Sequence, residues 1–137
     1  MVNRVEKLSL LSEMIAFAKY DKDIINIEYN FLLGVAKQLE VSRDDFEYLI
    51  DHPVNYVHLK SHSERIVQFH RLVLLMNIEQ EYNGDINSSG VIKLYNFGLR
   101  MGLSHESITK VLYLMDSFPN KIVPPDVLID IFKTHYN

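Results

Sequence analysis

The sequence predicts an all-α protein: a single-domain bundle of about seven helices built from two repeated helical halves. Apolar residues recur at the three- and four-residue spacing of amphipathic helices, whereas the alternation typical of strands is nearly absent. A second observation is an internal repeat at a constant offset of 62 residues. The identical pairs at this offset are Val5/Val67, Leu10/Leu72, Met14/Met76, Tyr20/Tyr82, Asp23/Asp85, Ile24/Ile86, Leu32/Leu94 and Ser42/Ser104.

The first half is expected to span about residues 4–50 and to hold three helices. Asn3 and Glu6 have the spacing of a capping box, Asn26 can cap the second helix, and Ser42 can cap the third. The predicted apolar faces of these helices are, in chain order, Leu8, Leu10, Leu11, Met14, Ile15, Phe17 and Ala18; Phe31, Leu32, Val35, Ala36 and Leu39; and Phe46, Leu49 and Ile50.

A polar connector with Pro53 is expected at residues 51–60, before a second half at about 66–115. Ser61 and Glu64 form a capping box for a long fourth helix, and Gly102 ends the fifth. Ser104 caps a sixth helix that ends near Met115. A last helix begins at Pro125 and spans about residues 125–135. Because neither half alone has three faces of core to cover, residues 1–137 are interpreted as one domain.

Composition excludes several classes of protein. The net charge of −4 provides no general attraction to nucleic acid, and the absence of cysteine excludes disulfides, thiol nucleophiles and cysteine-based zinc sites. No apolar run approaches the roughly 20 residues that span a bilayer, and the N-terminus lacks a signal-peptide cleavage pattern. We therefore expect a cytoplasmic protein with no membrane insertion and no nucleic-acid partner.

The most specific candidate site is an acidic turn formed by Asp21, Asp23 and Glu28. Carboxylates at this spacing can converge on a point, and hard divalent cations bind several such oxygens. Carbonyls at the end of the first helix would add partial negative charge, while Lys22 and Lys19 are competing neutralisers. The alternative interpretation is a solvated turn whose carboxylates complement a helix N-terminus.

Neither turn is a standard EF-hand. Counted from Asp21, the glycine position is Asn26 and the bidentate glutamate position is Leu32. Counted from Asn83, these positions hold Ser88 and Leu94.

The segment from Met14 to Glu28 nevertheless resembles the signature of the tellurite-resistance TerB-like family. That signature has an apolar helix followed by an Asp, with Ile three residues later and Glu seven residues later, which correspond to Asp21, Ile24 and Glu28. Leu39 to Ser42 is similar to the family's Leu-Gly-Leu-Ser. The family's glycine after the first Asp is Lys22 here, and the second copy has lost its acidic residues at Asn83 and Gly90.

The resemblance implies two related helical halves and at most one metal site, at Asp21, Asp23 and Glu28. One divalent cation would bind there, with calcium, magnesium or manganese favoured over zinc. The resemblance also implies a role in a stress-response complex near the membrane.

Other groups of residues that could indicate a function are better explained as parts of ordinary helices and loops. His58 and His62 are four residues apart, with His70 further on, but a helix starting at Ser61 leaves His58 outside and breaks a zinc geometry. Residues 102–110 resemble the turn and second helix of a helix-turn-helix, yet Lys110 is the only lysine or arginine among them. No phosphate-binding loop, nucleophile elbow or His-Glu-x-x-His motif is present, so we expect no enzymatic activity.

Eight tyrosines are the last feature, and packing in the core is the expected role for most of them. A partner-binding groove between the halves is the alternative. Two functional hypotheses follow: a cation-binding TerB-like module, or a metal-free protein-interaction or scaffold module with an aromatic surface. Either would have a protein partner that the sequence does not identify.

Overall fold

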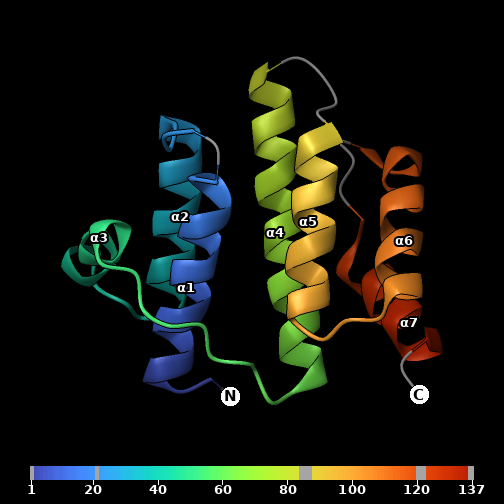
Figure 1. The fold of residues 1–137 in the computed structure, drawn as a ribbon, viewed down its shortest axis with the longest axis horizontal. Helices are drawn as coiled ribbons and strands as arrows, with labels where there is room; N and C mark the ends of the chain where they lie inside the picture. Colours follow the sequence, from blue (N-terminus) through green and yellow to red (C-terminus); the bar gives the residue numbers. More distant parts are fainter. Residues whose placement is uncertain (1, 21, 84–87, 120–122, 136–137) are drawn as a thin grey trace. The chain divides into compact units, whose positions relative to one another are not determined.

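A computed structural model of the chain describes residues 2–20, 22–83, 88–119 and 123–135. Within these ranges every regular element is a helix, which confirms the all-α prediction and the expected seven α-helices (Figure 1). The elements are α1 (Arg4–Ala18), α2 (Asn26–Gln38), α3 (Arg43–Asp51), α4 (His62–Asn83), α5 (Ser88–Arg100), α6 (His105–Leu114), the 3₁₀ turn η1 (Met115–Ser117) and α7 (Pro125–His135).

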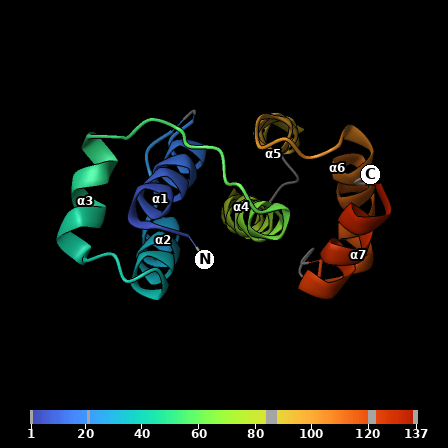
Figure 2. The same ribbon diagram turned by 90° about the horizontal axis from the view of Figure 1, so that it is seen from below.

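The helices form two compact units, Met1–Leu59 and Lys60–Asn137, with the boundary in the predicted connector. In the first unit α1, α2 and α3 all pack on one another, and α3 lies across the α1–α2 pair (Figures 1 and 2). In the second unit α4 packs on α5 and α7, and α6 packs on α5 and α7. The single-domain assignment of residues 1–137 stays a prediction.

The starts of two pairs of helices follow the predicted offset of 62 residues. Helices α2 and α5 each have 13 residues and begin at residues 26 and 88, and helices α3 and α6 begin at residues 43 and 105. The two units therefore repeat a helix pair in the same register along the chain. That these are TerB-like halves stays a prediction.

The C-terminal caps of α2 and α5 repeat at the same offset. After α2, Glu40 has a left-handed backbone with φ of 59°, and the Val41 N–H donates to the Ala36 carbonyl at 2.8 Å. After α5, Gly102 has φ of 81°, and the Leu103 N–H donates to the Gly98 carbonyl at 3.2 Å. Both are Schellman-type caps, but only the second has glycine, which adopts the left-handed backbone without steric cost.

We therefore expect Glu40→Gly to stabilise the protein by about 1 kcal/mol, because a residue with a Cβ is strained in the left-handed region. The reverse change, Gly102→Ala, should destabilise it by a similar amount. Urea unfolding followed by helical circular dichroism measures both. Equal stability of the parent and Glu40→Gly would show that the Glu40 side chain makes a compensating interaction.

Most predicted N-terminal caps are confirmed. Asn3 Oδ1 accepts the Glu6 N–H at 2.9 Å while Glu6 Oε1 accepts the Asn3 N–H at 3.0 Å, and Ser42 Oγ accepts the Asp45 N–H at 3.1 Å. The prediction that Asn26 caps α2 is wrong. Ile25 occupies that position. Because its side chain has no acceptor, the cap relies on another group.

The connector lies over α1 and explains why the polar side of this helix is covered (Figure 2). The Val54 N–H donates to Ser12 Oγ at 3.0 Å, and the Val57 N–H donates to Ser9 Oγ at 2.7 Å. Both serines are buried. Two buried hydroxyls thus accept hydrogen bonds from the backbone of the connector.

None of the described helices combines the length and the apolar character that crossing a bilayer requires.

Candidate functional site

The acidic turn joins α1 to α2. Its three predicted metal ligands differ in how far their side chains are buried and in whether the structure describes them. Asp21 lies outside the described residues. The Asp23 side chain is exposed, whereas Glu28, on the first turn of α2, is fully buried with 0% of its surface accessible. The arrangement of the three carboxylates together therefore stays a prediction.

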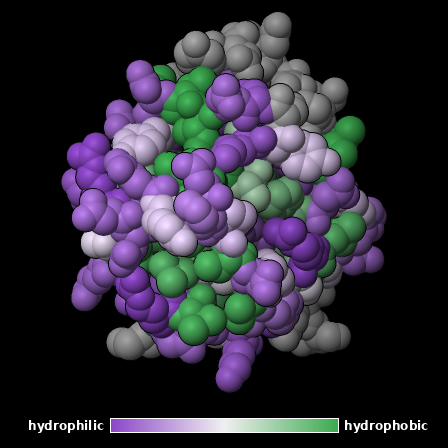
Figure 3. Space-filling model, turned by 60° about the vertical axis from the view of Figure 1, so that its left-hand side comes forward, coloured by the Kyte–Doolittle hydropathy of each residue, from purple (hydrophilic) through white to green (hydrophobic). Residues whose placement is uncertain are grey.

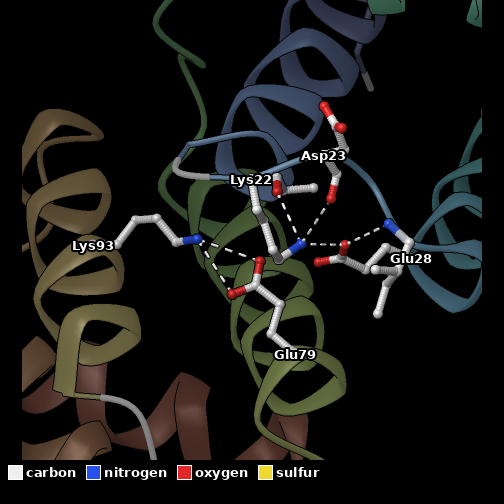
Figure 4. A network of polar contacts seen from close by, with 7 residues as sticks. Lys22, Asp23, Glu28, Glu79 and Lys93 are labelled. Carbon is white, nitrogen blue, oxygen red and sulfur yellow. Dashed lines mark hydrogen bonds and ion pairs between the residues drawn. The ribbon is translucent and has the colours of Figure 1, made fainter. Parts of the chain in front are cut away.

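The Lys22 ammonium lies at the centre of the described part of this turn (Figure 4). It donates to Glu28 Oε1 at 2.6 Å, to the Ala18 carbonyl at 3.2 Å and to the Asp23 carbonyl at 3.3 Å. The Ala18 carbonyl belongs to the C-terminal end of α1, where helix carbonyls lack intrahelical partners. The expected partial negative charge of this helix end is thus directed at a lysine.

Glu28 also supplies the missing cap of α2. Its Oε1 accepts the Ile25 N–H at 3.1 Å, which satisfies one donor at the start of the helix. Its second oxygen, Oε2, is buried and has no hydrogen-bond partner. Burying a carboxylate is costly unless it is paired, and the ion pair with Lys22 offsets part of this cost for Glu28.

The two other residues considered at this turn do not join the cluster. The Asp23 carboxylate points away from the Lys22 ammonium, to which this residue offers only its main-chain oxygen (Figure 4). Lys19 donates to the Ile50 carbonyl at 3.1 Å. Within the described residues no group of three or more His, Asp or Glu side chains is arranged to hold a metal ion. Most of the second turn, residues 84–87, lies outside the described residues.

A buried ion pair in the second unit was missed by sequence reasoning. The Lys93 ammonium on α5 lies 3.3 Å from both carboxylate oxygens of Glu79 on α4 (Figure 4). Both side chains are more than nine-tenths buried. The available signal was a lysine between Ile92 and Leu94 in an apolar helix, but its partner lies 14 residues away on another helix.

His58, His62 and His70 are not arranged as ligands of a zinc ion. Helix α4 begins at His62, and Ser61 Oγ accepts the Glu64 N–H at 3.4 Å, so His58 lies outside the helix as expected. His62 instead meets the Phe132 ring edge-on, with centroids 6.3 Å apart. His70 is half-buried, and its Nε2 is buried without a hydrogen-bond partner.

Burial lowers the pKa of both His62 and His70. For His62 the nearby Arg65 charge acts in the same direction. For His70 the Arg71 charge also lowers the pKa, whereas a hydrogen bond with the Val123 backbone raises it. Both imidazoles are therefore held in the neutral form more strongly in the folded protein than in the unfolded chain.

This difference predicts a loss of stability in mild acid. Because the folded pKa values lie below the unfolded value of about 6.5, the unfolded chain binds protons more readily, and stability falls as pH drops below about 6.5. Melting temperatures between pH 7.5 and 5.5 test this. The His62→Gln/His70→Gln variant should have a shallower slope, and an unchanged slope would assign the effect to other groups.

Helix α6 is an ordinary capped helix, as expected, with Ser104 Oγ accepting the Ser107 N–H at 3.1 Å. One face of it forms an open depression lined by His105, Glu106, Thr109, Lys110 and Tyr113. His105 also hydrogen-bonds the Tyr95 hydroxyl and meets its ring edge-on. Lys110 is the one basic side chain of this depression, so it offers little to a nucleic acid.

The expectation that tyrosines pack in the core is wrong for the described ones. None of the six described tyrosine side chains is buried, and Tyr113 exposes 77% of its surface. Tyr48 is also exposed and stacks on His52, with ring centroids 4.0 Å apart. On the face displayed in Figure 3, apolar side chains reach the surface in several separate groups with hydrophilic side chains between them.

Comparisons of the chain with protein-family models, with curated proteins and with solved structures found no match. The TerB-like assignment thus depends on the resemblance of residues 14–28 and 39–42 and stays a prediction.

Proposed function

We propose that this chain is a non-enzymatic helical module that binds a protein partner without a metal ion. The observation that carries this proposal is the Lys22–Glu28 ion pair at 2.6 Å. Glu28, which is the fully buried carboxylate in the described part of the acidic turn, has a cation supplied by the chain itself. A metal ion is therefore not needed to neutralise it.

Exposed tyrosines supply the binding chemistry in this proposal. Tyr20, Tyr48 and Tyr113 each expose more than 60% of their surface. Tyrosine combines a large apolar area with a polar hydroxyl, and it is enriched at protein interfaces. A partner contact built on such side chains needs no large continuous apolar patch.

The test is capture of a partner by chelator-treated protein, with Tyr20→Ala, Tyr48→Ala and Tyr113→Ala beside the parent. We expect a stoichiometric partner that survives the chelator and is lost with at least one of these variants, while the melting temperature is unchanged. Lys37→Ala, at an exposed position on α2, is the matched surface control and should retain the partner. Release of the partner by the chelator would contradict the proposal.

The second candidate is a TerB-like module that binds one divalent cation at Asp21, Asp23 and Glu28 and acts in a stress-response or membrane-associated complex. The buried, unpartnered Glu28 Oε2 favours it, because this oxygen is free to accept a ligand. Thermal unfolding of chelator-treated protein with added calcium, magnesium, manganese or zinc separates the candidates. An ion at 100 times its dissociation constant adds about 2.7 kcal/mol, a shift that Asp21→Asn/Asp23→Asn/Glu28→Gln should abolish.

A further inference from the structure

The oxygens around the Lys22 ammonium have the chemistry of a hard-cation site. Two are main-chain carbonyls, from Ala18 and Asp23, and one is a carboxylate oxygen of Glu28, at distances of 2.6–3.3 Å from Nζ. Calcium is bound in proteins by this combination of carboxylate and backbone carbonyl oxygens. The ammonium of lysine is a compact point charge, and that of Lys22 donates to all three of these oxygens.

The Glu28 carboxylate has a second oxygen that the Lys22 ammonium does not bind. Its Oε2 is buried and accepts no hydrogen bond, while Oε1 already serves Lys22 and the Ile25 N–H. A metal ion can bind both oxygens of a carboxylate, whereas the Lys22 ammonium bonds only one of them. Lys22 thus supplies a positive charge to this group of oxygens, but it leaves Glu28 Oε2 without a hydrogen bond.

We propose that Lys22 is a tethered cation occupying an oxygen-lined site, so that the side chain at position 22 decides whether the turn can take up a free metal ion. With lysine present the site is filled from within the chain. With a short side chain there, Glu28 and the carbonyls of Ala18 and Asp23 bind calcium. Magnesium binds less well because it demands a tighter octahedral shell. This proposal does not depend on the partner-binding function.

The experiment compares thermal unfolding of chelator-treated parent, Lys22→Ala and Lys22→Ala/Glu28→Gln, each with and without calcium. We expect Lys22→Ala to melt below the parent and calcium to raise its melting temperature by roughly 5–10 °C at 100 times the dissociation constant. The parent should not respond. The double variant should melt above Lys22→Ala and should not respond, because the amide introduced by Glu28→Gln is neutral and needs no cation.

Lys19→Ala is the matched control. It removes a nearby lysine whose ammonium donates to the Ile50 carbonyl and not to Glu28, so calcium should leave its melting temperature unchanged. If Lys22→Ala is unfolded without ions, recovery of helical circular dichroism on adding calcium becomes the measurement. Absence of any calcium response in Lys22→Ala, or a response of the parent, would overturn the proposal.

Discussion

Lys93→Met is expected to lower the free energy of unfolding by about 3–5 kcal/mol, because it removes one member of a buried ion pair. The Lys93 ammonium lies 3.3 Å from both oxygens of Glu79, and both side chains are more than nine-tenths buried. Without the ammonium, the Glu79 carboxylate stays more than nine-tenths buried and loses this ion pair. Its desolvation is then no longer offset by this contact.

The matched experiment is the double variant Lys93→Met/Glu79→Met. Since replacing both charges by apolar side chains of similar size is often neutral or stabilising, the double variant should recover most of the loss. Urea unfolding followed by circular dichroism gives the three free energies by linear extrapolation. A double variant as unstable as Lys93→Met alone would show that the loss comes from packing and not from the broken ion pair.

The second large effect is expected for Phe69→Ala, with a loss of about 3–5 kcal/mol. Phe69 on α4 is completely buried, and its ring meets that of Phe132 on α7 edge-on, with centroids 5.8 Å apart. Phe69 also lies close to the backbone of α5, because a methyl group at Gly98 would be 2.9 Å from Phe69 Cε1. One side chain therefore fills the space among three helices, and its truncation leaves a cavity.

A double-mutant cycle separates the ring pair from the cavity. Phe69→Ala, Phe132→Ala and the double variant should give a coupling of about 0.5–1.5 kcal/mol beyond the loss of buried area. Ile129→Ala, at a partly exposed position of the same helix α7, is the control and should cost far less. A small effect of Phe69→Ala would show that the surrounding helices collapse into the vacated space.

Local features of the fold could be predicted from the sequence because they depend on residues only a few positions apart. The capping pair Asn3 and Glu6, the cap at Ser42, and the stop at Gly102 all involve bonds spanning three to five residues. Helical periodicity of apolar residues has the same short range. The prediction failed at Asn26, although Asn26 and its neighbour Ile25 could each cap the helix. Ile25 is the N-cap because its N–H donates to the buried Glu28 carboxylate.

The acidic turn could be placed from the sequence, whereas the pairing of its described side chains could not. Three carboxylates near one turn indicate a place where a cation is favourable, and the residues alone leave open whether a metal, Lys19 or Lys22 provides it. The observed pairing of Glu28 with Lys22 depends on burial of Glu28 and on the path of the Lys22 side chain back to the Ala18 carbonyl. Burial is a property of the packed helices, so it cannot be deduced from the spacing of the carboxylates.

Sequence alone thus determined the helices, most of their caps and the register of the 62-residue offset, since these arise from short-range hydrogen bonds and periodic apolar positions. Tertiary structure decided the Lys93–Glu79 pair, the covering of Ser9 and Ser12 by the connector, and the exposure of the described tyrosines. The physical reason is that desolvation decides each of these outcomes. A polar group is either exposed to water or paired inside the protein, and which of the two holds depends on residues far away in the chain.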